Sequence, residues 1–387
     1  MTTSKLSRII QSKWFGYLCY ALLATFIAGF VYERFFNRTK GYYDMNMSCF
    51  AFRDVNRNGQ FDIEDYAYAG LEVAMDRPKG ESVTSFSNLN GFTNFKMKLG
   101  DRKLKINRPG NYSITVNPPS GWIITTDNGA QSMRIREMKE SPVGLVGDRT
   151  FSHVGIAPRL TVSGKIDQSI ESIYATDPDG NSKYITFSDT GNFQIEAFPG
   201  KWKLNLTAKD GKTLSRTFVV ENNPVILSSM GSQFELKPSS DRVEVATFDD
   251  ITTSDTLYEI PNGYVGLDWK NWVATHRLFY EKRSHVNAIV SSDYMAYTSS
   301  GHPSTIRSDE PFDFVGAYLA MSQPEGEEHD VVIRAWKGED LRYEDRLRPS
   351  EKGPRFFDAQ YRDITKLEFA NEAYWHIIID DFQFRRK

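Results

Sequence analysis

The feature that most constrains this chain is an uncharged, apolar run close to its N-terminus. Residues Trp14 to Tyr32 contain no Asp, Glu, Lys or Arg over 19 positions. As an α-helix this run is about 28 Å long, which matches the hydrocarbon core of one bilayer. Aromatic residues near its ends, among them Trp14 and Tyr17, suit the headgroup level of a membrane. The run predicts a single transmembrane helix.

A cleaved signal peptide is the alternative interpretation of the same run. Its apolar segment is usually only about 7–15 residues long, and no Ala-x-Ala cleavage site ends this one. We therefore expect an uncleaved signal anchor within residues 1–40. The expected location is a bacterial inner (cytoplasmic) membrane, with residues 41–387 on the periplasmic or extracellular side. Flanking charges are nearly balanced, so the orientation rests on the exported character of the remaining chain.

Charge and cysteine content exclude several classes of protein. Lys plus Arg number 47 and Asp plus Glu 50, for a net charge of −3, which argues against a nucleic-acid partner. The two cysteines, Cys19 and Cys49, exclude a disulfide scaffold and a cysteine-rich zinc site. No G-x-S-x-G or H-E-x-x-H sequence occurs, so no catalytic residues are assigned. An enzyme remains an open alternative, but a non-catalytic protein is favoured.

Short alternating runs bounded by Gly, Pro, Asn and Asp dominate the sequence after the anchor. Examples are Tyr112–Val116, Lys201–Leu206 and Val243–Phe248. Such alternation is typical of strands, and an aromatic content of 13% agrees with it. We predict a mostly β protein in which the transmembrane helix is followed by tandem β-sandwich domains ending in a jelly-roll. The expected domains are residues 41–158, 159–240 and 241–387.

One loop carries the clearest chemical pattern. From Asp54 to Asp65, oxygen-bearing side chains occupy loop positions 1, 3, 5, 9 and 12, and Gly59 occupies position 6. Calcium takes six to eight oxygen ligands, and a loop with this spacing can surround one ion with a glycine at its sharp turn. The alternative is an Asn- and Asp-rich turn without an ion. The predicted ligands are Asp54, Asn56, Asn58, Asp62 and Asp65, with the backbone carbonyl of Gln60.

Together with its strand-like flanks, this loop resembles the calcium-binding B repeats of bacterial surface adhesins. The resemblance covers about residues 48–158 and continues through Asn90-Gly91-Phe92 and Pro109-Gly110-Asn111-Tyr112. It implies a β-sandwich in which calcium is a structural cofactor. Residues 159–238 resemble the prealbumin-like or immunoglobulin-like spacer modules of exported proteins.

The C-terminal region resembles the jelly-roll domains related to carbohydrate-binding modules. Asp249-Asp250 lies near its start and Asp380-Asp381 near its end. The terminal strands of such folds pair, so these four carboxylates are a candidate second calcium site. The alternative is two solvated acidic pairs at strand ends.

Aromatic side chains in this region are candidate sugar-binding residues, because the apolar face of a pyranose stacks on a flat ring. A strand places Trp269 and Trp272 on opposite faces, so only one or two rings are expected to line a groove. The alternative is that each is a core or rim aromatic. The candidates are Tyr264, Trp269, Trp272, Tyr374 and Trp375.

These expectations combine into one functional hypothesis. The chain is a single-pass membrane protein whose calcium-stabilised β modules present a glycan-binding jelly-roll, in envelope adhesion or exopolysaccharide export. One alternative is an enzyme acting on polysaccharide through the C-terminal domain, which needs two convergent carboxylates in a cleft. The other is a structural or assembly subunit that binds other envelope proteins, for which a large exposed apolar patch is the expected sign.

Overall fold

The structure is a computed structural model that describes most of the chain beyond residue 12. The described residues are 13–31, 47–78, 80, 82–95, 109–138, 145–231, 242–252, 256–280, 283–299, 303–323, 326, 329–371 and 376–386.

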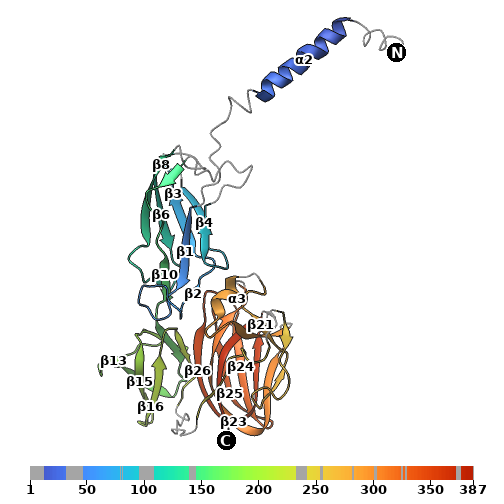
Figure 1. Cartoon of the computed structure of the whole chain (residues 1–387). Helices are drawn as coiled ribbons and strands as arrows, with labels where there is room; N and C mark the ends of the chain where they lie inside the picture. Colours follow the sequence, from blue (N-terminus) through green and yellow to red (C-terminus); the bar gives the residue numbers. More distant parts are fainter. Residues whose placement is uncertain are drawn as a thin grey trace. The chain divides into compact units, whose positions relative to one another are not determined.

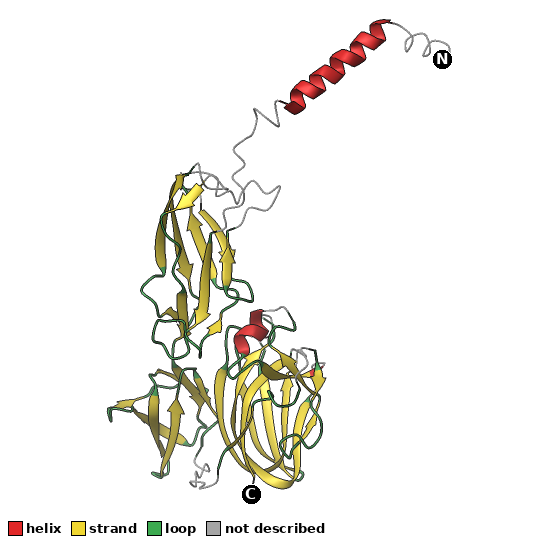
Figure 2. Cartoon of the chain, in the orientation of Figure 1, coloured by secondary structure: helices red, strands yellow, loops and turns green. Residues whose placement is uncertain are grey.

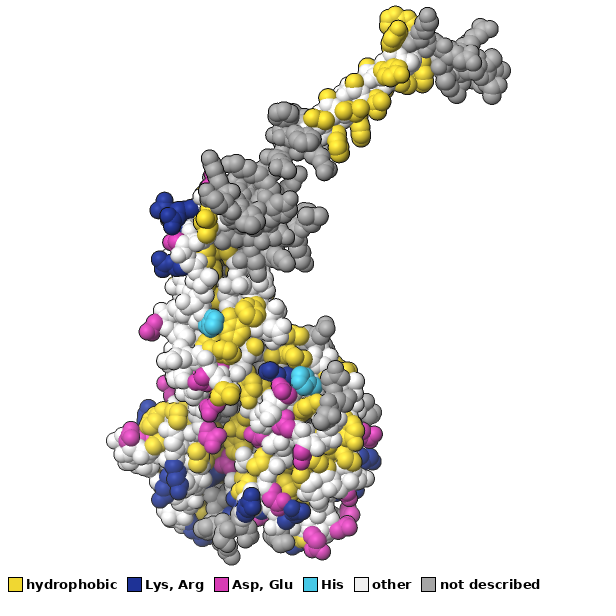
Figure 3. Space-filling model, in the orientation of Figure 1, with side chains coloured by type: hydrophobic (Ala, Val, Ile, Leu, Met, Phe, Trp, Pro, Cys, Tyr) yellow, Lys and Arg dark blue, Asp and Glu magenta, His cyan; other side chains and the backbone are white. Residues whose placement is uncertain are grey.

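Helix α2 (Lys13–Val31) is the N-terminal apolar run (Figure 1). Its segment Trp14–Val31 has a mean hydropathy of 1.7, and none of it is buried in the structure. In Figure 3 hydrophobic side chains lie along the length of the visible face of the helix. The predicted apolar helix is therefore present, with the length and composition of a membrane span. A signal sequence has the same properties, so export is indicated by either interpretation.

Strands make up nearly all remaining regular structure among the described residues, which confirms the predicted mostly β class (Figure 2). The described residues also include the short helix α3 (Arg283–Ala288). The strands are β1 (Ser48–Arg53), β2 (Tyr66–Ala67), β3 (Glu72–Asp76), β4 (Ser82–Phe86), β5 (Phe92–Asn94), β6 (Gly110–Asn117), β7 (Trp122–Ile124), β8 (Ala130–Glu137), β9 (Leu145–Gly147), β10 (Val154–Pro158), β11 (Thr161–Lys165), β12 (Ile170–Thr176), β13 (Ser182–Tyr184), β14 (Asn192–Glu196), β15 (Gly200–Ala208), β16 (Thr213–Val220), β17 (Val225–Leu227), β18 (Glu244–Ala246), β19 (Tyr258–Glu259), β20 (Asp268–Lys270), β21 (Trp272–His276), β22 (Tyr294–Thr298), β23 (Ser304–Met321), β24 (Val331–Lys337), β25 (Asp340–Leu347), β26 (Arg355–Asn371) and β27 (Ile377–Arg386).

Two compact units divide the chain. Unit 1 comprises Met1–Met47, Phe95–Tyr112 and Met133–Thr150. It contains helix α2 and the antiparallel pairing of β8 with β9, in which Ile135 lies opposite Gly147. Unit 2 comprises Ser48–Asn94, Ser113–Ser132 and Phe151–Lys387, and it contains every contact described from here on.

The first module of unit 2 is built on strand β1. On one side β1 pairs in parallel with β10, which pairs with β7, and on the other it pairs with β2 and β5. A second sheet contains β4, β3 and β6 in that order. The alternating burial of β3 follows from its sequence, because Val73 and Met75 face the core while Glu72 and Ala74 do not.

The middle module has one sheet of its own, in the order β13-β12-β15-β16. Its other strands, β14, β11 and β17, belong to a sheet that continues into the C-terminal module. There β17 pairs in parallel with β26, with Val225 opposite Phe356 and Leu227 opposite Asp358. The two modules therefore share one sheet. The predicted boundary segment 237–241 lies outside the described residues.

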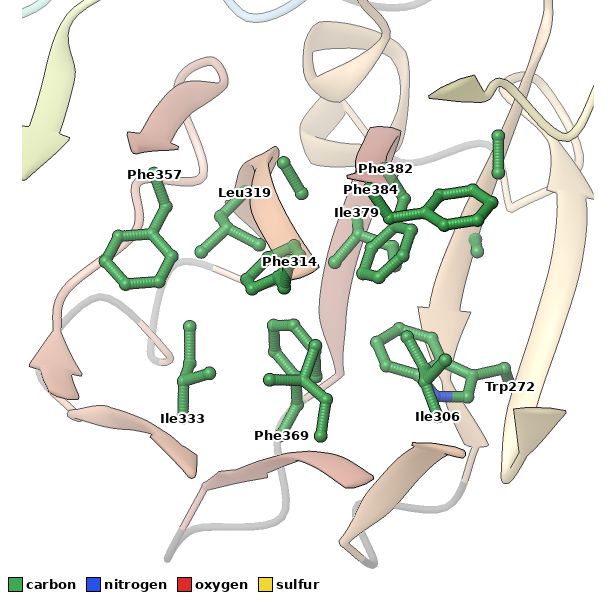
Figure 4. Close-up of a cluster of buried hydrophobic side chains, with 14 of the residues drawn as sticks. Trp272, Ile306, Phe314, Leu319, Ile333, Phe357, Phe369, Ile379, Phe382 and Phe384 are labelled. Atoms are coloured by element: carbon green, nitrogen blue, oxygen red, sulfur yellow. The ribbon is translucent and has the colours of Figure 1, made fainter. Parts of the chain in front are cut away.

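The C-terminal module is centred on the long strands β23, β26 and β27, which lie side by side in Figure 1 (β23 and β26 are labelled there). Strand β18 pairs with β27, with Ala246 opposite Phe382, so the first and last strands of this module are neighbours as predicted. Its core contains Trp272, Phe314, Phe369 and Phe382, all fully buried. Figure 4 shows these rings pointing toward one another from different strands. Burial of large aromatic rings stabilises the module.

Side chains from the two strands that flank the Asp54–Asp65 loop dock on the C-terminal module. Arg53, 4% exposed, donates to the carbonyl oxygens of Asn287 (3.1 Å) and Ile289 (2.5 Å). Tyr66, its cross-strand neighbour, donates from its hydroxyl to the carbonyl of Val290 at 2.9 Å. The Arg53 guanidinium also lies 4.9 Å from the centre of the Tyr66 ring. The first and third modules are thus joined by buried, hydrogen-bonded polar groups.

A buried ion pair joins the middle and C-terminal modules. Arg216 on β16 donates to the Asp358 carboxylate on β26 at 2.8 Å, and their side chains are 1% and 6% exposed. The same guanidinium donates to the hydroxyl of Ser228 at 3.0 Å. Gln360 donates to the other carboxylate oxygen of Asp358 at 2.7 Å. Each buried charge therefore has an oppositely charged partner, which lowers the cost of removing it from bulk water.

Candidate functional sites

The Asp54–Asp65 loop folds back on itself through its own polar side chains. Both carboxylate oxygens of Asp54 accept backbone N–H groups, from Asn58 at 3.1 Å and from Gly59 at 2.8 Å. Asp65 closes the loop by accepting the N–H groups of Val55 at 2.8 Å and of Asp62 at 3.0 Å. The φ of Gly59 is +73°, a conformation that glycine adopts without strain. The sharp turn at loop position 6 is therefore where the sequence predicts it.

The exposed side chains of Asn56 and Asn58 both contact Asp62 across the loop. Both amide nitrogens donate to the same oxygen of Asp62, at 2.8 Å each. These two hydrogen bonds lower the pKa of Asp62, so it is anionic at neutral pH. Their amide oxygens accept backbone N–H groups, that of Asn56 from Asn58 and that of Asn58 from Gln60. An ion between these side chains requires both amides to rotate so that oxygen replaces nitrogen.

The side chains of this loop carry the oxygen atoms that calcium prefers as ligands. Burial raises the pKa of Asp65 most, its hydrogen bonds from the backbone oppose the rise, and the charges of Asp62 and Asp54 add to it. Three carboxylates are thus close enough to repel one another, and a divalent cation offsets such repulsion. Among the described residues, no group of three or more His, Cys, Asp or Glu side chains is already arranged around a metal position. The amides of Asn56 and Asn58 are needed to complete the set.

Three of the four carboxylates in the acidic pairs of the C-terminal module accept hydrogen bonds from one short segment, residues 290–294. Asp380 is 1% exposed and accepts the N–H groups of Val290 (2.8 Å) and Ser291 (3.1 Å). Asp381 accepts the hydroxyl of Ser291 at 2.7 Å. Asp249 accepts the N–H groups of Asp293 and Tyr294, both at 3.1 Å.

The fourth carboxylate, Asp250, accepts the hydroxyl of Tyr264 at 2.8 Å. Burial raises the pKa of Asp380 well above its usual range, and the neighbouring Asp381 adds to the rise. Strand pairing does bring the two ends of the module together, but each carboxylate has its own protein donors. Burial raises the pKa of Asp381 and the charge of Asp249 adds to the rise, so the two pairs lie close together. A shared calcium ion at these carboxylates stays a prediction.

The structure corrects the assignment of the two tryptophans to a sugar-binding surface. Trp272 is fully buried and Trp269 is 3% exposed, and both belong to the core of the C-terminal module (Figure 4 labels Trp272). Their rings touch edge to face, with centroids 6.0 Å apart. A buried indole has no face available to a pyranose. The alternation expected of one strand does not apply, because Trp269 lies on β20 and Trp272 on β21, and Asn271 between these strands has a φ of +61°.

The remaining aromatic candidates fare differently. Tyr264 is half-buried, packs against Trp269 with ring centroids 6.1 Å apart, and uses its hydroxyl on Asp250. Tyr374 and Trp375 lie outside the described residues. No described aromatic platform of the predicted kind therefore forms on the C-terminal module.

Cavities at the junctions between modules were not predicted from the sequence. One, of about 430 Å³, is lined by all three modules, including Trp122, Arg159, Gln194 and Arg355. A second, of about 560 Å³, lies between the middle and C-terminal modules and includes Lys165 and Arg346. A third, of about 290 Å³, includes Glu221, Tyr318 and Asp358. The only sequence feature that relates to these cavities is the Arg- and Pro-containing segment 348–355. Its position beside the middle module depends on the pairing of β17 with β26, which local sequence does not indicate.

No protein-family model matches this chain, and no curated protein matches it. Distant likenesses exist among solved structures. The Bacillus anthracis TIE protein matches at 11% identity and a TM-score of 0.23, over 49% of this chain and 34% of that one. This chain thus spans about a third of that protein's length.

The shaft pilin SpaA of Lactobacillus rhamnosus GG matches at 10% identity and a TM-score of 0.22, over 49% of this chain and 96% of the pilin. The CBM51-2 and INT domains of Clostridium perfringens ZmpB, solved in complex with GlcNAc, match at 13% identity and a TM-score of 0.24, over 58% of this chain and 48% of that one. These scores are too low to carry an argument about function.

Proposed function

We propose that this chain is a membrane-anchored exported protein whose joined β modules bind a glycan, in envelope adhesion or exopolysaccharide export. The observation that carries the proposal is the combination of an exposed apolar helix, Lys13–Val31, with a β body whose modules are joined by buried polar contacts. An anchored body of this kind keeps a bound ligand tethered to the membrane.

Glycan binding is supported by the chemistry of the junction cavities. Their volumes of about 430 and 560 Å³ fall within the range of about 300–1,000 Å³ typical of ligand pockets. Hydroxyl, amide and charged side chains make up much of their lining, among them Thr161, Asn192 and Gln194. Sugars expose many hydroxyl groups, and side chains that both donate and accept hydrogen bonds match them.

A structural calcium ion in the Asp54–Asp65 loop is part of the proposal. It is supported by the convergence of Asp54, Asp62 and Asp65 and by the raised pKa of Asp65. Bound there, calcium supplies positive charge that neutralises these carboxylates. Asn56 and Asn58 contribute ligands only in the rotated state of their amides.

A protein-binding role in envelope assembly is the second candidate, and one surface favours it. Phe61 is 48% exposed and packs against Phe50 and His153, with ring centroids 4.9 Å and 6.2 Å away. Ile63, two residues further on, is fully exposed. Exposed apolar clusters of this kind are typical of interaction sites.

The proposal is tested in two steps with the full chain. Membrane fractionation after carbonate washing should leave the protein in the membrane, and a reporter fused after residue 45 should report the exported side. The detergent-solubilised chain is then titrated with a glycan panel and with envelope polysaccharide. A soluble mature chain beginning near residue 30 contradicts the anchor. If no glycan binds, and a Phe61→Ser/Ile63→Ser variant loses a protein partner, the assembly role replaces glycan binding.

A further inference from the structure

Two of the junction cavities adjoin one another and form one cleft. The cavities of about 430 and 560 Å³ share Gln194, Arg348 and Arg355 in their linings. We call the combined feature the junction cleft. The middle module contributes β11 and β14, and the C-terminal module contributes the segment 348–355 between β25 and β26. The first module closes one end with Gly121 and Trp122.

Basic side chains dominate the charged groups of the junction cleft. The cations are Arg159, Lys165, Arg346, Arg348, Lys352 and Arg355. The acidic side chains in the same linings are Glu196 and Asp345. Asp345 is 7% exposed and already accepts hydrogen bonds from Ser229 and from the hydroxyl of Tyr361. On a chain of net charge −3, this concentration of positive charge creates a local field that attracts anions.

Existing ion pairs do not cancel this charge. Arg348 bonds to Asp330 at 2.7 Å, and Arg346 lies 3.4 Å from Glu344, but these arginine side chains are 65% and 51% exposed. Exposed pairs are held weakly because water screens the attraction. Arg159 and Lys165 form no ion pair within the described part of the chain, and both are exposed. Their charges are available to a ligand.

The segment that carries half of the cations is held in place by the fold. Pro349 and Pro354 are buried and restrict the backbone at both ends of the segment. The hydroxyl of Tyr68 donates to the carbonyl of Lys352 at 3.0 Å. A Cβ on Gly353 would lie 2.8 Å from the Trp122 ring, so the backbone is packed against this indole. Binding therefore needs little additional ordering of this backbone segment, which favours affinity.

We propose that the junction cleft binds an anionic glycan, a polysaccharide that carries carboxylate groups along its length. The inference rests on the proposed glycan-binding function and names its site and ligand class. Arginine presents a planar fork of donors that matches a carboxylate, while neutral groups such as Gln194 and Thr161 suit sugar hydroxyls. The cavity of about 290 Å³ has the acidic residues Glu221 and Asp358 in its lining, and negative charge there disfavours an anionic ligand.

The test uses the full chain in detergent micelles and fluorescently labelled polygalacturonate, with neutral dextran as the matched polymer. Polygalacturonate should bind and dextran should not, and binding should weaken as ionic strength rises past about 0.15 M. An Arg159→Gln/Lys165→Gln variant should lose roughly tenfold or more in affinity, because each change removes a charge-assisted contact. Both side chains are exposed, so the thermal midpoint should not change.

Lys201→Gln/Lys203→Gln is the control, because it removes the same charge from exposed positions on β15. It should bind as the unaltered chain does. An equal loss in the control, or no loss in the cleft variant, overturns the proposal. Poly-glutamate, which has carboxylates but no sugar, should compete poorly, and equal competition means that the cleft recognises charge alone and overturns the ligand class. If a neutral glycan binds and polygalacturonate does not, the proposed glycan-binding function stands and the anionic-glycan site is wrong. If no glycan binds, both proposals are wrong.

Discussion

Val225 on β17 and Phe356 on β26 are opposite residues in a parallel strand pairing that joins the middle and C-terminal modules into one sheet. The pairing is short, with three residue pairs from Val225 to Leu227. It is reinforced by Arg216, which reaches from β16 to Asp358. Because a hydrogen-bonded sheet crosses the junction, the middle module does not behave as an independent spacer. The position of the junction cleft depends on this continuity.

Breaking the Arg216–Asp358 pair should strongly destabilise unit 2. We expect Arg216→Met to lower the free energy of unfolding by about 3–5 kcal/mol, because Asp358 is left charged and buried. Denaturant unfolding followed by tryptophan fluorescence measures the effect. Lys212→Met, which removes the exposed Lys212–Asp210 pair, is the control and should have no measurable effect. The double variant Arg216→Met/Asp358→Leu should recover much of the loss, and a loss as large as that of the single variant contradicts this account.

The sequence predicts the local features of this protein better than its long-range ones. The apolar run at Trp14 and the alternation in β15 each depend on a few neighbouring residues, and both appear as expected. The turn at Gly59 is equally local. By contrast, the burial of Trp269 depends on β23 and β27, which lie far along the chain. The junction cleft depends on the parallel pairing of β17 with β26, which no local sequence pattern predicts.

Trp272 provides a test of the corrected aromatic assignment. Trp272→Ala should cost about 3–5 kcal/mol in unfolding free energy, because it leaves a cavity among Trp269, Phe369 and other core side chains. Trp272→Phe should cost less, since it keeps a ring and removes an indole N–H that has no hydrogen-bond partner within the described residues. Urea denaturation measures both. If Trp272→Ala leaves stability unchanged but abolishes glycan binding, the residue is a ligand contact after all.

Calcium should stabilise unit 2 through the Asp54–Asp65 loop. We expect a calcium-dependent rise in the thermal midpoint that is absent in Asp54→Ala/Asp62→Ala, because an ion that binds only the folded state shifts the equilibrium by mass action. Asp177→Ala/Asp179→Ala, in a turn of similar composition, is the control and should keep the rise. The loop begins after Arg53 and ends before Tyr66, so chelation should also speed amide exchange at residues 287–290. A calcium response that survives in the loop variant places the ion elsewhere.

Cys49 should be an unreactive thiol in the folded protein. It is fully buried, and burial raises its pKa to about 11. At pH 8 only about one thiol in a thousand is then ionised, and the thiolate is the reactive form. Iodoacetamide should therefore label Cys49 slowly in the native chain and rapidly in guanidinium chloride, as read by peptide mass spectrometry. Rapid native labelling contradicts the burial of β1.

Asp380 should make part of the protein's stability decrease as pH rises. Burial raises its pKa well above the usual value, and Asp381 adds to the rise. The contribution is therefore fully present below the unfolded-state pKa of about 3.9 and is lost as pH rises through the folded-state value. Arg53, whose own pKa is lowered by burial, is the nearby cation and partly offsets the effect.

We expect Asp380→Asn to flatten the pH dependence of the unfolding free energy above about pH 4, measured by urea titration at several pH values. Asp179→Asn, in an exposed turn, is the matched control and should keep the slope of the unaltered chain. An unchanged slope in Asp380→Asn means that this carboxyl does not titrate between the folded and unfolded states as its burial requires.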